Sequence, residues 1–284
     1  MSPHRSGARD TPPLPAPLPI PVVDNHVHLD IARDGEVAPT PEDAIARATK
    51  VGVTRMVQVG CDRPGARFTV AAIDQHPALI GGIAMHPNEI PALARSGELT
   101  EALDEIEQLT AHPRVRAVGE TGLDYFRTSP EGIPAQQEAF RWHIDLAKRT
   151  GKALQIHDRD AHDDVLRILD EEGAPVHTVL HCFSGDQAFA RAAVERGLML
   201  SFAGTVTFKT AKGLRDALAV TPLDRLLVET DAPYLTPTPY RGATNASYLV
   251  PLTVRAMADV LNVDTPTLCA AIATNSERVY GSWT

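Results

Sequence analysis

The chain has 284 residues, of which 43% are hydrophobic. This is enough for one sizeable core and is close to the ~250 residues of an α/β barrel. The formal charge of −9 argues against a polyanion binder with a basic surface. The three cysteines are widely spaced and form no CxxC pair, so free thiols and a cytoplasmic location are expected. The chain contains no run of about 18 uninterrupted apolar residues, so we expect no segment to span a membrane and no membrane partner.

The first nineteen residues are rich in proline and lack the apolar core of a secretory signal. We therefore expect residues 1–19 to form a disordered or extended tail. Residues 20–284 are expected to form a single domain.

Eight short apolar runs alternate with segments of helical periodicity, a pattern typical of parallel strands linked by helices. The runs begin near residues 20, 53, 79, 115, 153, 178, 198 and 226, and helical segments include 41–52, 99–113, 135–151 and 186–197. A spacing of about 33 residues suits one strand, one helix and their loops. The pattern therefore favours a closed (β/α)8 TIM barrel over an open doubly wound sheet. No GxGxxG follows the first run, so no dinucleotide cofactor is expected.

The active site of such a barrel lies at the carboxyl ends of its strands. Five of the eight runs end in side chains that can bind a metal, namely His26, His28, Glu120, His157, His181 and Asp231. His26 and His28 are two residues apart, so in a strand they point to the same side. Imidazole with carboxylate suits zinc, manganese, iron or cobalt, whereas magnesium normally prefers oxygen ligands.

Six ligands are more than a single catalytic ion with an open position would use. We therefore expect two divalent ions, with Glu120 as the bridging carboxylate. Asp231 follows a very apolar strand and is the candidate general base that accepts a proton from an attacking water. Glu120 and Asp231 are thus the candidate catalytic residues.

Four further residues are candidates for substrate binding. His86 ends the third run and could contact a phosphate, although a loop or capping role is an open alternative. Arg159 could hold a phosphate by two hydrogen bonds, or could pair with a nearby aspartate instead. Lys209 and Arg241 lie in the loops expected after strands seven and eight, where barrels often bind phosphate. Surface charge is the alternative for both.

Several stretches together resemble the TatD-type metal-dependent hydrolases, a deoxyribonuclease branch of the amidohydrolase-like barrels. The matching stretches are DNHVHLD, GETGLDYF, QIHDRDA, VLHCFSG, LSFAGTVTFK and LLVETDAPYLTP, and the resemblance covers essentially everything after residue 20. It implies that His26, His28 and Asp231 bind one metal, that His157 and His181 bind the second, and that Glu120 bridges them. It also implies a divalent-metal-dependent DNase, often a 3′ to 5′ exonuclease, with DNA as its substrate. The ions would be Mg, Mn, Zn or Co.

The loop YRGATNAS departs from the family pattern, which is close to YRGKRNEP. Arg241, Gly242 and Asn245 fit this pattern, whereas Ala246 replaces a glutamate. A barrel can change its substrate through its loops, so hydrolysis of a small ester, amide or lactone, or of an aminoacyl-tRNA ester, is the alternative function. A non-catalytic metal-binding protein would be expected to lack a ligand or the base, and this chain lacks neither.

Overall fold

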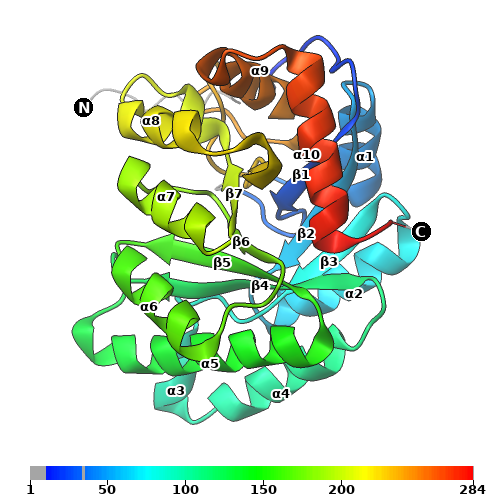
Figure 1. Cartoon of the computed structure of the whole chain (residues 1–284). Coiled ribbons are helices and arrows are strands. Elements are labelled where there is room, and N and C mark those ends of the chain that lie inside the picture. Colours follow the sequence, from blue (N-terminus) through cyan, green and yellow to red (C-terminus); the bar gives the residue numbers. More distant parts are fainter. Residues whose placement is uncertain (1–10, 34–35, 284) are drawn as a thin grey trace, which may run out of the picture.

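The computed structural model describes residues 11–33 and 36–283, which form a barrel of parallel strands (Figure 1). Each of the eight predicted runs contains one strand, and each strand pairs with the next in chain order. Parallel neighbours need crossover connections, which place the helices on the outside. The predicted single-domain (β/α)8 TIM barrel is confirmed. The strands are β1 Val22–Val27, β2 Val53–Gly60, β3 Leu79–Ile83, β4 Val115–Asp124, β5 Ala153–Arg159, β6 Thr178–Leu180, β7 Met199–Phe202 and β8 Leu226–Val228.

The barrel closes where the chain beyond β8 meets the end of β1. Val27 forms a parallel bridge with Ala232. The amide of Asp231 donates to the carbonyl of His26 at 3.0 Å, and the amide of His28 donates to the carbonyl of Ala232 at 2.9 Å. Because these bonds lie at the carboxyl ends of both strands, the closure itself places Asp231 beside the two histidines of the first motif.

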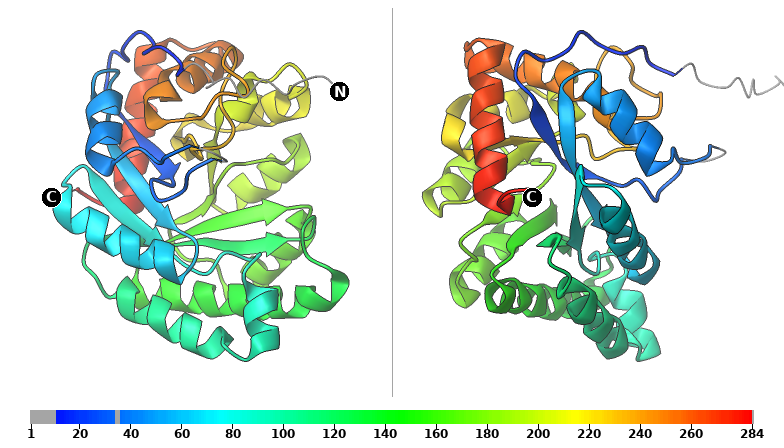
Figure 2. Two further views of the ribbon diagram at one scale, coloured as in Figure 1. Left: turned by 180° about the vertical axis from the view of Figure 1, so that it is seen from behind. Right: turned by 90° about the vertical axis from the view of Figure 1, so that its right-hand side faces the viewer.

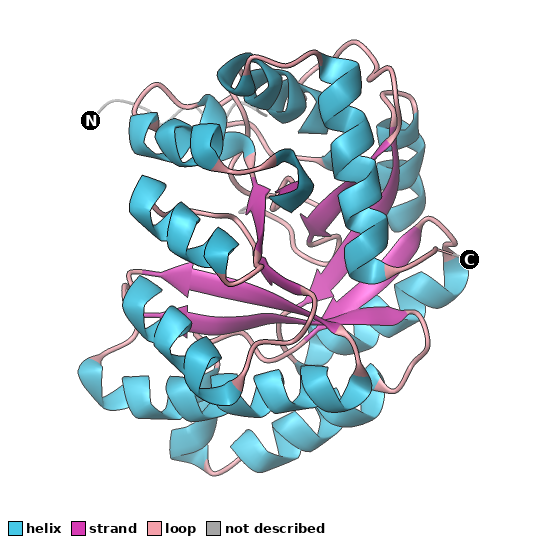
Figure 3. Cartoon of the chain, in the orientation of Figure 1, coloured by secondary structure: helices cyan, strands magenta, loops and turns pink. Residues whose placement is uncertain are grey.

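Helices surround the strands in the described residues (Figure 3). Several begin at a polar cap: the Thr40 hydroxyl accepts from the amide of Asp43 at 3.2 Å, and Asp186 accepts from the amide of Phe189 at 2.9 Å. None of these helices is long and apolar enough to cross a membrane. They are α1 Pro41–Thr49, α2 Arg63–Gln75, α3 Ile90–Ser96, α4 Leu99–Thr110, α5 Ile133–Thr150, α6 His162–Glu172, α7 Gln187–Glu195, α8 Lys212–Val220, α9 Val250–Leu261 and α10 Thr265–Tyr280.

Apolar side chains fill the amino end of the barrel. Side chains from the strands, among them Val57 and Met199, form one buried cluster with Tyr280 at the end of α10 and with Trp283 beyond it. The Gln155 amide donates to the Tyr280 hydroxyl at 2.6 Å and so ties this helix to the barrel interior. A larger cluster fills the layer between strands and helices. With one end packed in this way, the opposite end is left for the functional site.

Of the two expectations for the tail, disordered or extended, the structure has the extended one for residues 11–19. This segment is extended and lies against the barrel beside α9 and α10 (Figure 2, blue). The Tyr248 hydroxyl donates to the carbonyl of Pro12 at 3.0 Å, and Arg255 donates to that of Ala16 at 2.7 Å. Leu18 is only 7% exposed, and its amide donates to the carbonyl of Val51 at 3.0 Å. Proline composition is compatible with an extended segment when other side chains satisfy its carbonyls. The prediction for residues 1–10 lies outside the described residues.

Candidate metal centre

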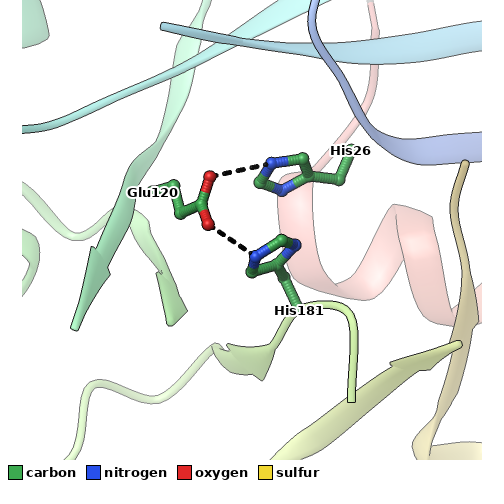
Figure 4. A group of neighbouring side chains, drawn as sticks. All are labelled: His26, Glu120 and His181. Atoms are coloured by element: carbon green, nitrogen blue, oxygen red, sulfur yellow. Dashed lines mark hydrogen bonds and ion pairs between the residues drawn. The ribbon is translucent and has the colours of Figure 1, made fainter. Parts of the chain in front are cut away.

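The side chains predicted as ligands lie together at the carboxyl end of the barrel. They come from β1, β4 and β5 and from the residues that follow β1, β6 and β8. Glu120 lies at their centre, between His26 and His181 (Figure 4). The other five predicted ligands lie around this carboxylate, namely His26, His28, His157, His181 and Asp231.

The two oxygens of Glu120 face different groups of donors. On one side, Oε1 lies 2.7 Å from His157 Nδ1 and 2.7 Å from His181 Nε2, which are hydrogen-bonding distances. His86 Nε2 lies 3.3 Å from the same oxygen. Of the four candidates for substrate binding, His86 is therefore the one that contacts the ligand cluster itself.

On the other side, Oε2 of Glu120 lies 3.4 Å from His26 Nε2. The Nε2 atoms of His26 and His28 are 3.2 Å apart, and His28 Nε2 is 3.4 Å from Asp231 Oδ1. Nitrogen and oxygen ligands at 2.0–2.1 Å from a tetrahedral zinc are roughly 3.3 Å from one another. His28 Nε2 lies 3.8 Å from Glu120 Oε2, so the donor spacings on this side run from 3.2 to 3.8 Å, close to those around a small divalent cation.

Hydrogen bonds behind the imidazoles set their orientation. The carbonyl of Val59 lies 2.9 Å from His28 Nδ1. A carbonyl only accepts, so Nδ1 carries a proton, and it is Nε2 that would bind a cation once the ring is neutral. Glu229 Oε1 lies 3.2 Å from His181 Nδ1 and also accepts from the amide of Cys182 at 2.7 Å. The sequence reasoning missed Glu229, although its place two residues before Asp231 was an available signal.

The electrostatics of the cluster keep its carboxylates ionised. Burial by itself would raise the pKa of Glu120, but the positive charges of His181 and His86 outweigh burial and hold this pKa well below its usual range. Burial likewise opposes ionisation of Asp231, and a hydrogen bond from His28 with the charge of His181 lowers its pKa. Although burial disfavours the charged ring of His181, the charges of Glu120 and Glu229 raise its pKa well above the ordinary value. A bound cation would have to displace the His181 proton.

Cys61, which the sequence reasoning treated only as a free thiol, also faces this cluster. Its Sγ lies 3.4 Å from Glu120 Oε2, directly after the end of β2. Position 61 itself carries neither a histidine nor a carboxylate, so the pattern of ligands at strand ends did not reveal it. As expected, Cys61, Cys182 and Cys269 are all free thiols.

Arg159 and Arg241 each stack on an aromatic ring near the carboxyl end of the barrel. The guanidinium of Arg159 lies 3.9 Å from the centre of the Phe126 ring, and that of Arg241 lies 4.0 Å from the centre of the Phe208 ring. Phe126 is 61% exposed, so its pair with Arg159 lies at the protein surface. Lys209 is exposed in the loop after β7. These three basic residues lie outside the shell of candidate ligands around Glu120.

Asn245 has a structural role in the divergent loop after β8. Its side-chain amide donates to the carbonyl of Thr230 at 2.9 Å and to that of Tyr234 at 2.6 Å. These bonds hold the loop against the segment that carries Asp231. The neighbouring Ala246 supplies no polar side-chain atom.

Comparison with known proteins agrees with this architecture. A family model described as "TatD related DNase" matches residues 23–281. An uncharacterized metal-dependent hydrolase TatD of Mycobacterium tuberculosis is 47% identical over 266 residues, covering 92% of this chain and 98% of the relative. An uncharacterized metal-dependent hydrolase YabD of Bacillus subtilis is 37% identical over 260 residues, covering 90% of this chain and 98% of the relative.

Solved structures extend the comparison to three dimensions. The crystal structure of YjjV, a TatD homologue from Escherichia coli, has a TM-score of 0.82 at 25% identity and covers 92% of this chain and 98% of its own. A TatD-family hydrolase from Entamoeba histolytica has a TM-score of 0.79 at 18% identity, covers 94% of this chain and 99% of its own, and supports the fold alone. The chain therefore belongs to the TatD related DNase family of metal-dependent hydrolases.

Proposed function

We propose that this chain is a DNase that removes nucleotides from the 3′ end of DNA and holds two divalent ions on either side of Glu120. His26, His28 and Asp231 would hold one ion, and His157 and His181 the other. The observation that carries the proposal is the arrangement of the Glu120 carboxylate, whose two oxygens face two separate groups of imidazoles. A carboxylate so placed is suited to bridge two cations.

When bound, such ions stabilise charge that develops on a phosphoryl oxygen and lower the pKa of water. The chain's own residues supply positioning and proton transfer. The side chain of Asp231 is 16% exposed, against 5% for Glu120 and 0% for His26, so it is the most accessible of the three to a substrate or water. As an ionised carboxylate it can accept the proton of the attacking water. Arg159 and Arg241 can bind neighbouring phosphates, which local cations allow despite the net charge of −9.

The test is cleavage of a single-stranded oligonucleotide labelled at its 5′ end by metal-stripped protein, with Mg²⁺, Mn²⁺, Co²⁺ or Zn²⁺ added back. A ladder of shorter labelled products that depends on a metal is expected from the wild type. Asp231→Asn should abolish the ladder, and Glu120→Gln should abolish it without unfolding the protein. Full cleavage by Glu120→Gln would refute the bridging role.

A pocket beside the site favours hydrolysis of a small substrate as the second candidate function. Its volume is about 440 Å³, and its lining includes His28, Ala232, Pro233 and Tyr248. A pocket of this size holds a small organic molecule. If the protein binds metal but leaves DNA intact, rates on panels of small esters, amides, lactones and aminoacyl-tRNA would test this candidate.

A further inference from the structure

Cys61 lies among groups that can bind a metal. Its Sγ, one ligand atom of His28 and one oxygen of Glu120 all lie within 4.8 Å of one another. The carbonyl of Cys61 accepts from the amide of His86 at 2.8 Å, so the backbone at this position is held to the end of the neighbouring strand. The backbone that carries the thiol is therefore held at the rim of the site.

The distance from Cys61 to Glu120 is compatible with two ligands of one ion. With Zn–S near 2.3 Å and Zn–O near 2.1 Å, the sulfur and oxygen are roughly 3.1 Å apart at an angle of 90° and roughly 3.6 Å apart at the tetrahedral angle, a range that also covers a fifth ligand. Cys61 Sγ lies 3.4 Å from Glu120 Oε2. The same oxygen faces His26, which together with His28 and Asp231 forms the candidate site on this side of the carboxylate.

We propose that Cys61 is a further ligand of the ion on the Oε2 side of Glu120, and that its sulfur makes this position selective for zinc or cobalt over magnesium. The inference rests on the proposed metal centre. On binding, the thiol releases its proton to solvent, and the thiolate donates an electron pair to the cation. Thiolate ligands favour soft and borderline cations, whereas magnesium requires oxygen ligands.

Spectroscopy of the cobalt-loaded full chain tests the proposal without reference to activity. Cobalt(II) bound by the wild type should show a thiolate-to-cobalt charge-transfer band in the near ultraviolet. The band should disappear in Cys61→Ser and persist in Cys182→Ser. Cys182 is a matched control because it is the other thiol close to the cluster. Its hydrogen bond to Glu229 comes from the backbone amide and does not involve the thiol.

Metal affinity supplies a second readout. In competition with a chelator, Cys61→Ser should bind Zn²⁺ at least about 10-fold more weakly than the wild type, since even the loss of a group that orients a ligand can cost this much. Its affinity for Mg²⁺ should be unchanged. The serine hydroxyl can still donate to Glu120, and Cys61→Ala replaces this variant if circular dichroism shows that it does not fold.

The outcomes separate this inference from the metal centre on which it rests. Cobalt bound without a charge-transfer band, or a band that survives in Cys61→Ser, would overturn the role of Cys61 and leave the histidine site intact. A wild-type chain that binds no cobalt would overturn both.

Discussion

His143 is buried in α5 as a neutral ring, and its protonation should destabilise the fold. Its Nδ1 lies 2.7 Å from the carbonyl of Ala139, and its Nε2 accepts from the amide of Met85 at 3.2 Å. One nitrogen therefore donates and the other accepts, which only the neutral imidazole can do. Burial lowers the pKa of His143 to about 4 from its ordinary value of 6.5, despite the hydrogen bond to Ala139.

The sign of the pH effect follows from the direction of this shift. Below pH 6.5 the unfolded chain takes up a proton at His143 that the folded chain binds only near pH 4, so stability is lost as the pH falls. Each pH unit within this window costs about 1.4 kcal/mol. Between pH 7.5 and pH 5.0 the group should therefore remove about 2 kcal/mol of the free energy of unfolding.

The assay is urea unfolding of metal-free wild type and His143→Gln at both pH values. Glutamine can still accept from Met85 and donate to Ala139, but it does not titrate. The wild type should lose about 2 kcal/mol more than the variant on going from pH 7.5 to pH 5.0. Equal losses in the two proteins would show that His143 is not held neutral, and the reasoning would fail.

Three further predictions follow from other contacts. Glu229→Gln should weaken zinc binding by about 10-fold, because it removes the charge that orients His181, and titration calorimetry would measure the change; unchanged affinity would contradict this role. Leu18→Ala should lower the free energy of unfolding by about 2 kcal/mol, because this side chain is buried, whereas no change in urea unfolding would be expected of a disordered tail. Adding Zn²⁺ to chelator-treated protein should raise its Tm, because the ion binds selectively to the folded state, and the rise in Tm should be smaller for Glu120→Gln. An equal rise in Tm for that variant would place zinc elsewhere.

The apolar runs and their spacing were sufficient to predict the barrel and its candidate ligands. The periodicity of apolar residues and the composition of each segment indicate whether the segment forms a helix or a strand. Parallel strands bring their carboxyl ends to one end of the barrel, so residues such as His26 and Glu120 could be placed near each other from sequence alone. The grouping of the imidazoles around the two oxygens of Glu120 required coordinates, because it depends on side-chain orientation.

Contacts between segments distant in sequence were beyond the reach of the pattern. Proline content near the start indicated a disordered or extended tail and gave no sign that Leu18 packs into the core. It does so because the chain at Val51 and in α9 supplies partners for the segment. Cys61 and Glu229 reach the ligand cluster from the segments that follow β2 and β8. Local sequence encodes which element each residue joins, whereas hydrogen bonds and burial between distant elements arise only when the closed barrel brings those elements together.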